Sequence, residues 1–310
     1  EALIRDVIED VLGRLGGSPT NVTAASTAKP AGYNGSCGCQ AKGSGGRDFG
    51  VFKTADEACD AAAKAFQQLR GQGVEARRRI VEIVKSLCED NAEEWGRIEL
   101  EETKIGRLDH KIEKLQIIRN VPGVEWLRPD GLSGDHGITL EEYTPSGVLG
   151  AVTLSTHSIP TLAGNIVNIV AAGNAVVCNA HPAASRCAAV AVRKFNEAIH
   201  RAIGIENIVT IIEQPTLEWF GEMCANENVR LLCVTGGPGV VVAAMKTGKR
   251  AICAGPGNPP VLVDATADID RAARCVVQGA AYDNNLLCIG EKEVLVLDSV
   301  ADAFMSALEE

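Results

Sequence analysis

A cysteine in a polar connection is the residue of this sequence best suited to covalent chemistry. Cys288 lies in the stretch 283–292, which separates a helix-like segment from a strand-like run. Loops positioned by a scaffold carry a large share of catalytic residues, and a thiolate is a strong nucleophile. Asn284 and Asn285 offer the hydrogen-bond donors that a developing oxyanion would need. The alternative is a buried structural thiol, since two leucines directly precede the cysteine and cysteine packs well in apolar cores.

Three turns upstream carry polar residues or glycines directly after strand-like runs. The first turn contains Ser155, Thr156 and His157, the second His181 and Pro182, and the third Thr235, Gly236 and Gly237. Glycines before a helix let backbone N–H groups approach a phosphate closely, although a single turn of this kind also occurs in ordinary structure. Three such turns in succession predict a binding site for a nucleotide cofactor.

The histidines give weaker signals. His157 and His181 follow strand ends, where a histidine is more often a satisfied polar residue than a catalyst. His110, His136 and His200 have no evident partners and are predicted to lie at the surface. The sequence contains neither metal-ligand spacing nor a paired-carboxylate pattern, so we predict no metal site.

The elements that must position these turns alternate between strand and helix. Strand-like runs cover 138–143, 148–153, 175–178, 208–212, 231–234, 251–253 and 261–263, and helix-like runs cover 160–172, 182–201, 216–225, 239–246 and 268–281. Such alternation indicates crossover connections and a mostly parallel, doubly wound α/β sheet. Ligands of such sheets bind in the crevice at the carboxyl ends of the strands, where the three turns lie.

A helical layer is predicted ahead of the first strong strand. A capping box at 54–57 opens a helix to about Arg70, and helical periodicity continues with breaks through 75–91, 92–105 and 108–120. Trp95 and Trp126 are predicted to pack in the core or between layers.

Composition limits the class of protein. With 46% hydrophobic residues in 310, the chain can bury a sizeable core. Forty acidic side chains against 30 basic ones argue against nucleic acid as a partner. Eleven irregularly spaced cysteines are typical of reduced thiols in a cytosol-like compartment rather than a disulfide framework. Neither an apolar run of membrane-spanning length nor a secretory signal is found, so we expect a cytoplasmic protein without a membrane partner.

The first 48 residues differ from the rest. Apolar residues recur at three- and four-residue steps over 1–15, which predicts an amphipathic helix in the segment 1–17. The segment 18–48 is rich in Gly, Ser, Ala and Thr and is predicted to be a flexible linker. The helix could pack back on the main domain or dock in the groove of a partner.

Six motifs together resemble the aldehyde dehydrogenase superfamily. In chain order they are Thr153-Leu-Ser-Thr-His-Ser-Ile-Pro160, Ala171-Ala-Gly-Asn-Ala-Val-Val, His181-Pro182, Thr235-Gly-Gly-Pro-Gly239, Ala254-Gly-Pro-Gly-Asn-Pro-Pro260 and Asp283-Asn-Asn-Leu-Leu-Cys288. The match covers roughly 50–310 and is most similar to the CoA-acylating acetaldehyde and propionaldehyde dehydrogenases of bacterial microcompartments. Members of that branch often carry an N-terminal amphipathic encapsulation peptide on a linker, and residues 1–48 resemble this arrangement.

The resemblance implies roles for individual residues. Cys288 matches the thiolate nucleophile, and His157 falls where the family usually has an asparagine that donates to the oxyanion. The residues that the resemblance places at the cofactor are Ser155, Thr156, His181, Pro182, Thr235, Gly236, Gly237 and Gly255. It also implies a Rossmann-like domain for NAD and CoA over 49–253, with the start of a second α/β catalytic domain over 254–310.

The resemblance further implies which acceptor takes the acyl group. Hydrolytic members carry a glutamate upstream of the cysteine as the base for water, whereas 250–263 contains no carboxylate here. Without that base, an incoming thiol becomes the natural acceptor. We therefore expect oxidation of acetaldehyde, propionaldehyde or lactaldehyde to its acyl-CoA with NAD and coenzyme A.

Other consequences of the resemblance are a microcompartment shell protein as partner through 1–17 and a homo-oligomer at full length. Family members continue beyond the helix that ends at Glu310, so the chain resembles a fragment. Two alternatives stay open: a dehydrogenase that releases the free acid, and an inactive cargo or scaffold protein.

Overall fold

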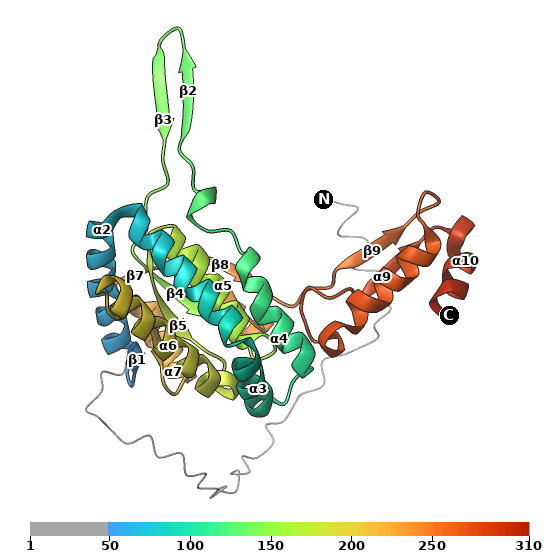
Figure 1. Cartoon of the computed structure of the whole chain (residues 1–310), viewed down its shortest axis with the longest axis horizontal. Helices are drawn as coiled ribbons and strands as arrows, with labels where there is room; N and C mark the ends of the chain where they lie inside the picture. The colour runs from blue at the N-terminus through green and yellow to red at the C-terminus, as the bar shows by residue number, and fades with distance from the viewer. Residues whose placement is uncertain (1–48, 310) are drawn as a thin grey trace, which may run out of the picture. The chain divides into compact units, whose positions relative to one another are not determined.

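The computed structural model describes residues 49–309, so the predictions for 1–17 and 18–48 lie outside the described part. The elements shown in Figure 1 are β1 (Val51–Phe52), α2 (Ala55–Asp90), α3 (Ala92–Thr103), α4 (Leu108–Gln116), η1 (Ile117–Asn120), η2 (Val124–Trp126), β2 (Asp130–Gly134), β3 (Gly137–Glu141), β4 (Val148–Val152), α5 (Ser158–Ala171), β5 (Ala175–Asn179), η3 (Pro182–Ala184), α6 (Ser185–Ile203), β6 (Val209–Ile212), α7 (Leu217–Ala225), β7 (Val229–Thr235), α8 (Pro238–Met245), β8 (Arg250–Ala254), β9 (Pro260–Val263), α9 (Ile269–Ala281), η4 (Tyr282–Asn285), β10 (Glu293–Val296) and α10 (Asp298–Glu309).

A six-stranded parallel sheet in the order β1-β6-β5-β4-β7-β8 confirms the predicted doubly wound fold. The chain runs outward from β4 to β5 and β6 and then returns to β7 and β8 on the other side of β4. Because parallel crossovers are right-handed, α5 and α6 must cover one face and α7 and α8 the other. Every residue of β4 and β5 is buried, as expected for central strands covered on both faces. The switch in direction at β4 opens a crevice at the carboxyl ends of the strands.

The predicted helical layer is present with one difference. α2 is two helical arms joined at Gly73, whose φ of 73° and ψ of −166° interrupt the helix between the two predicted segments. Trp95 is fully buried and stacks edge-on against Phe195, with ring centroids 5.4 Å apart. The prediction for Trp126 is wrong, because its side chain is 71% exposed in the short η2 turn.

The run 138–143 does form a strand, but it lies outside the main sheet. β3 pairs antiparallel with β2, and Figure 1 shows this hairpin extending away from the sheet and helices. All ten residues of the two strands are exposed, including Leu132, Ile138 and Leu140. β2 was not predicted, since its sequence Asp-Gly-Leu-Ser-Gly has the composition of a turn.

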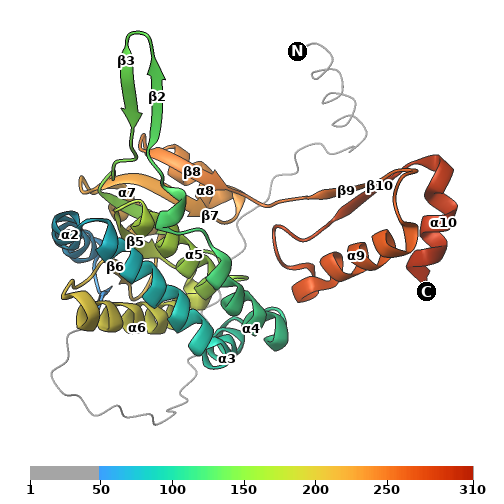
Figure 2. The same ribbon diagram turned by 45° about the horizontal axis from the view of Figure 1, so that its top comes forward.

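A small second group of elements with its own sheet follows β8. β9 and β10 pair in parallel, and α9 runs alongside them in Figure 2. Val263, Ala273, Val276 and Phe304 form its buried cluster, which is separate from the large core of the six-stranded sheet. Asp268 begins α9 as predicted, because its side chain accepts a hydrogen bond from the Arg271 N–H at 3.1 Å.

Candidate active site

The loop that carries Cys288 is held by its own polar groups. Nζ of Lys292 donates to the carbonyl oxygens of Asn285 and Leu287 at 3.2 and 3.1 Å. The side-chain amide of Asn285 donates to the carbonyl oxygens of Ala280 and Glu291 at 2.6 and 3.0 Å. This amide is therefore used to brace the loop rather than offered to an oxyanion. Cys288 itself is half-buried on the connection, as its sequence context predicts.

The turn after β8 packs directly against the cysteine. A Cβ added at Gly257 would lie 2.1 Å from the carbonyl oxygen of Cys288, so only glycine allows this approach. The turn belongs to the stretch 250–263, which contains no carboxylate. No acidic side chain can therefore reach the thiol from this neighbouring turn.

A cavity of about 460 Å³ adjoins the loop. Its lining includes His157, the thiol of Cys275, and Leu287 and Ile289 on either side of Cys288, which is not itself a lining residue. Nε2 of His157 is buried and has no hydrogen-bond partner within the described residues. Burial, reinforced by the charges of Lys114 and Lys111, lowers the pKa of His157 to about 3. The imidazole is therefore neutral at neutral pH, with a proton on one ring nitrogen and a lone pair on the other.

A second cavity, of about 390 Å³, lies in the crevice at the strand ends. The ends of β4, β5 and β7 contribute six of the residues predicted to bind a cofactor: Ser155, His181, Pro182, Thr235, Gly236 and Gly237. Thr156 and Gly255 are not among its lining residues. Thr235 ties two strands together here, because its hydroxyl donates to the carbonyl oxygen of Val152 at 2.9 Å.

Two carboxylates on α3 hold the helices that begin at this crevice. The carboxylate of Glu99 accepts hydrogen bonds from the N–H groups of Ser158 and Ile159, at 3.3 and 3.0 Å, at the start of α5. Glu102 accepts from the N–H groups of Arg186 and Cys187, at 2.8 and 2.6 Å, at the start of α6. These side chains already satisfy the positive ends of both helices.

The start of α8 is different. A Cβ at Gly237 would meet nothing within 4 Å, so the backbone there is open to an incoming group. Gly237 lines the crevice and immediately precedes Pro238, the first residue of α8. Because glycine-flanked helix starts favour anions, these residues fit the phosphates of a nucleotide.

The family model for the aldehyde dehydrogenase family matches residues 50–310. The chain belongs to the aldehyde dehydrogenase family. It is 42% identical over 264 residues to the acetylating acetaldehyde dehydrogenase EutE of Salmonella typhimurium, a match that spans 84% of this chain and 56% of that protein. The chain thus spans less than two thirds of the relatives it matches.

Solved structures of the family agree. A propionaldehyde dehydrogenase of Rhodopseudomonas palustris with bound propionyl-CoA superimposes with a TM-score of 0.80 at 41% identity, over 85% of this chain and 59% of that one. A propionaldehyde dehydrogenase from the fucose-utilisation microcompartment of Clostridium phytofermentans gives a TM-score of 0.81 at 40% identity, over 84% and 60% of the two chains. The superfamily and branch inferred from the six motifs are therefore confirmed.

The prediction that His110 lies at the surface without a partner is wrong. Its Nδ1 accepts a hydrogen bond from the Asp283 N–H at 2.8 Å, and its ring stacks on Tyr282 with centroids 4.2 Å apart. Lys114 was also missed, although it lies one helical turn after His110 on the same face of α4. The four-residue spacing from His110 was the only local signal that the two side chains share a partner, since polar residues on a helix usually face solvent.

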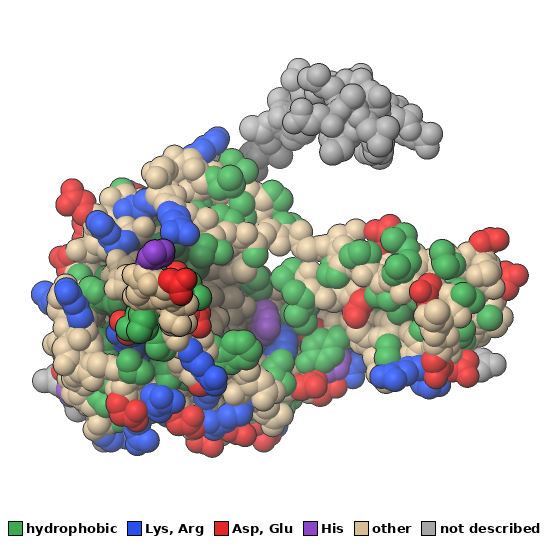
Figure 3. Space-filling model, turned by 90° about the horizontal axis from the view of Figure 1, so that it is seen from above, with side chains coloured by type: hydrophobic (Ala, Val, Ile, Leu, Met, Phe, Trp, Pro, Cys, Tyr) green, Lys and Arg blue, Asp and Glu red, His purple; other side chains and the backbone are tan. Residues whose placement is uncertain are grey.

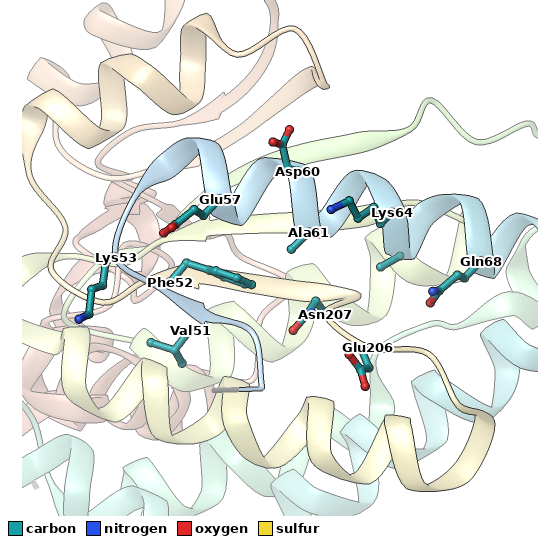
Figure 4. Close-up of a pocket in the computed structure, with 11 residues that line it drawn as sticks. Val51, Phe52, Lys53, Glu57, Asp60, Ala61, Lys64, Gln68, Glu206 and Asn207 are labelled. Atoms are coloured by element: carbon teal, nitrogen blue, oxygen red, sulfur yellow. The ribbon is translucent and has the colours of Figure 1, made fainter. Parts of the chain in front are cut away.

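A larger cavity of about 600 Å³, drawn in Figure 4, lies away from this chemistry. Lys53, Glu57, Asp60, Lys64 and Glu206 line it beside β1 and the start of α2. The lining contains no thiol and no histidine, so it offers no nucleophile or general base of the kind found near Cys288.

No described helix combines the length and apolar character needed to cross a bilayer, and no described group of three or more His, Cys, Asp or Glu side chains could hold a metal. On the face shown in Figure 3, Lys and Arg side chains are interspersed with acidic ones.

The buried His157 should make stability pH-dependent. Its pKa is about 3 in the folded state and about 6.5 when unfolded, so between these values only the unfolded chain takes up the proton. Stability is therefore lost as the pH falls below 6.5. Relative to His157→Asn, the unsubstituted protein should lose an additional ~2 kcal/mol between about pH 7 and about pH 5. Urea unfolding of both proteins at the two pH values measures this difference, and equal losses would contradict the assignment of a neutral buried imidazole.

Proposed function

We propose that the full-length protein is an NAD-dependent, CoA-acylating dehydrogenase of short aldehydes such as acetaldehyde, propionaldehyde or lactaldehyde. The observation that carries the proposal is the cavity shared by the neighbours of Cys288 and the unpartnered Nε2 of His157. A thiol on the loop beside a cavity that also holds a hydrogen-bond donor suits attack on a carbonyl carbon. The Rhodopseudomonas palustris relative, solved with bound CoA and an acylated cysteine, supports the same chemistry.

The first half of the reaction uses Cys288 and His157. The Cys288 thiolate forms a C–S bond to the aldehyde carbon, and the carbonyl oxygen becomes an oxyanion. The neutral ring of His157 can donate one hydrogen bond to that oxygen without first losing a positive charge. NAD, when bound in the crevice, supplies the hydride acceptor that lets this adduct collapse to a Cys288 thioester.

The second half replaces one thiol by another. The CoA thiolate attacks the thioester carbon, forms acyl-CoA and releases the Cys288 thiolate. The turn at Gly257 packs against the cysteine and offers no carboxylate to activate water. The acyl group is thus protected from hydrolysis on that side until CoA arrives.

One carboxylate gives the hydrolytic alternative a physical basis. Glu291 lines the cavity of His157 and could orient a water molecule from the other side of the loop. Product analysis of the full-length protein with NAD and a short aldehyde, with and without CoA, separates the two functions. Acyl-CoA formed only when CoA is present supports the proposal, and free acid formed at an equal rate without CoA overturns it. No NADH under either condition would favour the inactive cargo protein.

The cellular context is part of the same proposal. Relatives come from microcompartments, and the amphipathic pattern of 1–17 supports attachment to a shell protein. The fully exposed β2–β3 hairpin, with its apolar side chains, supports assembly with further copies of the chain. Co-localisation of a reporter fused to 1–17 with a shell, and the mass of the full-length protein in solution, test these two points.

A further inference from the structure

One buried lysine on α4 touches both turns that converge on the cavity. Nζ of Lys114 lies 2.6 Å from Oδ2 of Asp283 and 3.4 Å from the carbonyl oxygen of Thr156. Asp283 belongs to the loop of the nucleophile, and Thr156 immediately precedes His157. The Lys114 side chain is 2% exposed and that of Asp283 is fully buried. A single ammonium group therefore links the nucleophile loop to the turn that carries the hydrogen-bond donor.

Asp283 is held from three directions. Its Oδ1 accepts the N–H of Arg107 at 2.9 Å, and its own N–H donates to Nδ1 of His110 at 2.8 Å. A Cβ at Gly106 would lie 2.2 Å from Oδ1 of Asp283, so the carboxylate fills the space that glycine leaves. A side chain at position 106 would therefore displace the Asp283 carboxylate from this place.

The backbone of the loop depends on these contacts. Asp283, Asn284 and Asn285 have φ values of 49°, 58° and 59°, three successive non-glycine residues in the left-handed region. Such residues persist only where the surroundings over-determine them. The contacts of Asp283 fix the first of the three, and Cys288 follows five residues later.

Lys114 and Asp283 form a buried salt bridge. Burial alone would raise the pKa of Asp283, but the bonds from Lys114 and the Arg107 N–H outweigh it and hold the pKa below its ordinary value. Burial lowers the pKa of Lys114, and its bond to Asp283 opposes that shift. Because desolvation offsets much of the attraction in a buried pair, stability alone is a weak reason for it. The pair is better explained by the way it holds the loop of Cys288 against the turn that precedes His157.

We infer that Lys114 and Asp283 are positioning residues, which set the placement of Cys288 relative to His157. Lys114 also lines the cavity, but its ammonium group is engaged by Asp283 and by the Thr156 carbonyl oxygen. The kinetic consequence rests on the proposed function, whereas the structural consequence does not.

Kinetics of the full-length enzyme give the first test. In Lys114→Met, kcat should fall by about 10²-fold, because a small misplacement of reacting groups costs that much, with the KM values for aldehyde and NAD little changed. Arg97→Met is the matched control, since it also replaces a cation with methionine, at an exposed position on α3 where Arg97 pairs with Glu93 outside the site. The control should keep the original kcat.

A double variant separates positioning from charge compensation. Lys114→Met with Asp283→Asn removes both buried charges, and the amide that replaces the carboxylate does not require an ammonium partner. The double variant should be more stable than either single variant yet keep the low kcat. Recovery of the original kcat in the double variant would overturn the inference, because the pair would then matter only as two charges that cancel.

Hydrogen exchange gives a readout that needs no activity. Amides of 283–291 should exchange faster in Lys114→Met and in the double variant than in the unsubstituted protein, and at an unchanged rate in Arg97→Met. Unaltered exchange in that loop would overturn the inference whatever the kinetics. If the unsubstituted protein lacks CoA-dependent oxidation, the proposed function fails, and the exchange result still decides the role of Lys114.

Discussion

Replacement of Cys288 by alanine in the full-length protein is expected to lower aldehyde- and CoA-dependent NADH formation by about 10³-fold or more. Without the thiolate no covalent adduct forms, so neither hydride transfer nor acyl transfer to CoA has a starting point. The fold should survive, because the side chain is only half-buried and the loop is braced by Lys292 and Asn285. Initial rates of NADH absorbance, together with thermal unfolding of both proteins, measure the two effects.

A different thiol provides the control. Cys253 lies in β8, is partly buried and takes no part in the chemistry described above, so Cys253→Ala should retain activity. Mass spectrometry of protein mixed with aldehyde and NAD in the absence of CoA should find the acyl group on Cys288. Substantial turnover by Cys288→Ala, or acylation of another residue, would remove the basis of the proposed mechanism.

Replacement of Glu99 by alanine is expected to destabilise the protein by about 3–5 kcal/mol, the usual cost of breaking a buried ion pair on one side. Oε1 of Glu99 lies 2.7 Å from Nζ of Lys111, and both side chains are 1% exposed. The substitution would leave the Lys111 charge buried without its partner. It would also leave the N–H groups of Ser158 and Ile159 at the start of α5 without an acceptor.

Denaturant unfolding of the variant measures this cost. Glu101→Ala is the matched control, because Glu101 lies on the same helix but is exposed and should change stability little. Equal midpoints for the Glu99 and Glu101 variants would show that the buried carboxylate does not hold the start of α5.

The sequence was sufficient for the central strands of the sheet, whereas the edge strand β1 was not predicted. β4, β5 and β7 are runs of apolar residues that end in polar or glycine-containing turns, and such a pattern leaves few alternatives to a parallel sheet. Six motifs in register also pointed to Cys288 and the crevice residues, because turn residues at strand ends carry their chemistry in local sequence. The hairpin was harder to predict, since β2 lacks apolar alternation and gains its partner only when β3 pairs with it.

The support of the site could not be predicted in the same way. Glu99, His110 and Lys114 lie on helices far from Cys288 in sequence, where a charged residue ordinarily indicates a solvated face. Their partners are backbone N–H groups up to 173 positions away and a carboxylate 169 positions away, so nothing in the local pattern distinguishes them. Only the packing of α3 and α4 against the two turns reveals which polar side chains are buried.

The distribution of thiols has a consequence for how the chain tolerates electrophiles. Burial raises the pKa of Cys59 and Cys88 to about 12 and that of Cys224 to about 11, so these sulfurs stay protonated and enclosed. Cys178 and Cys187 are likewise buried, with raised pKa values. An aldehyde or oxidant that reaches these five buried cysteines therefore meets protonated, unreactive thiols. Modification by an electrophile should therefore concentrate on the more accessible thiols, which among the described residues are the exposed Cys275 and the partly buried Cys233, Cys253 and Cys288.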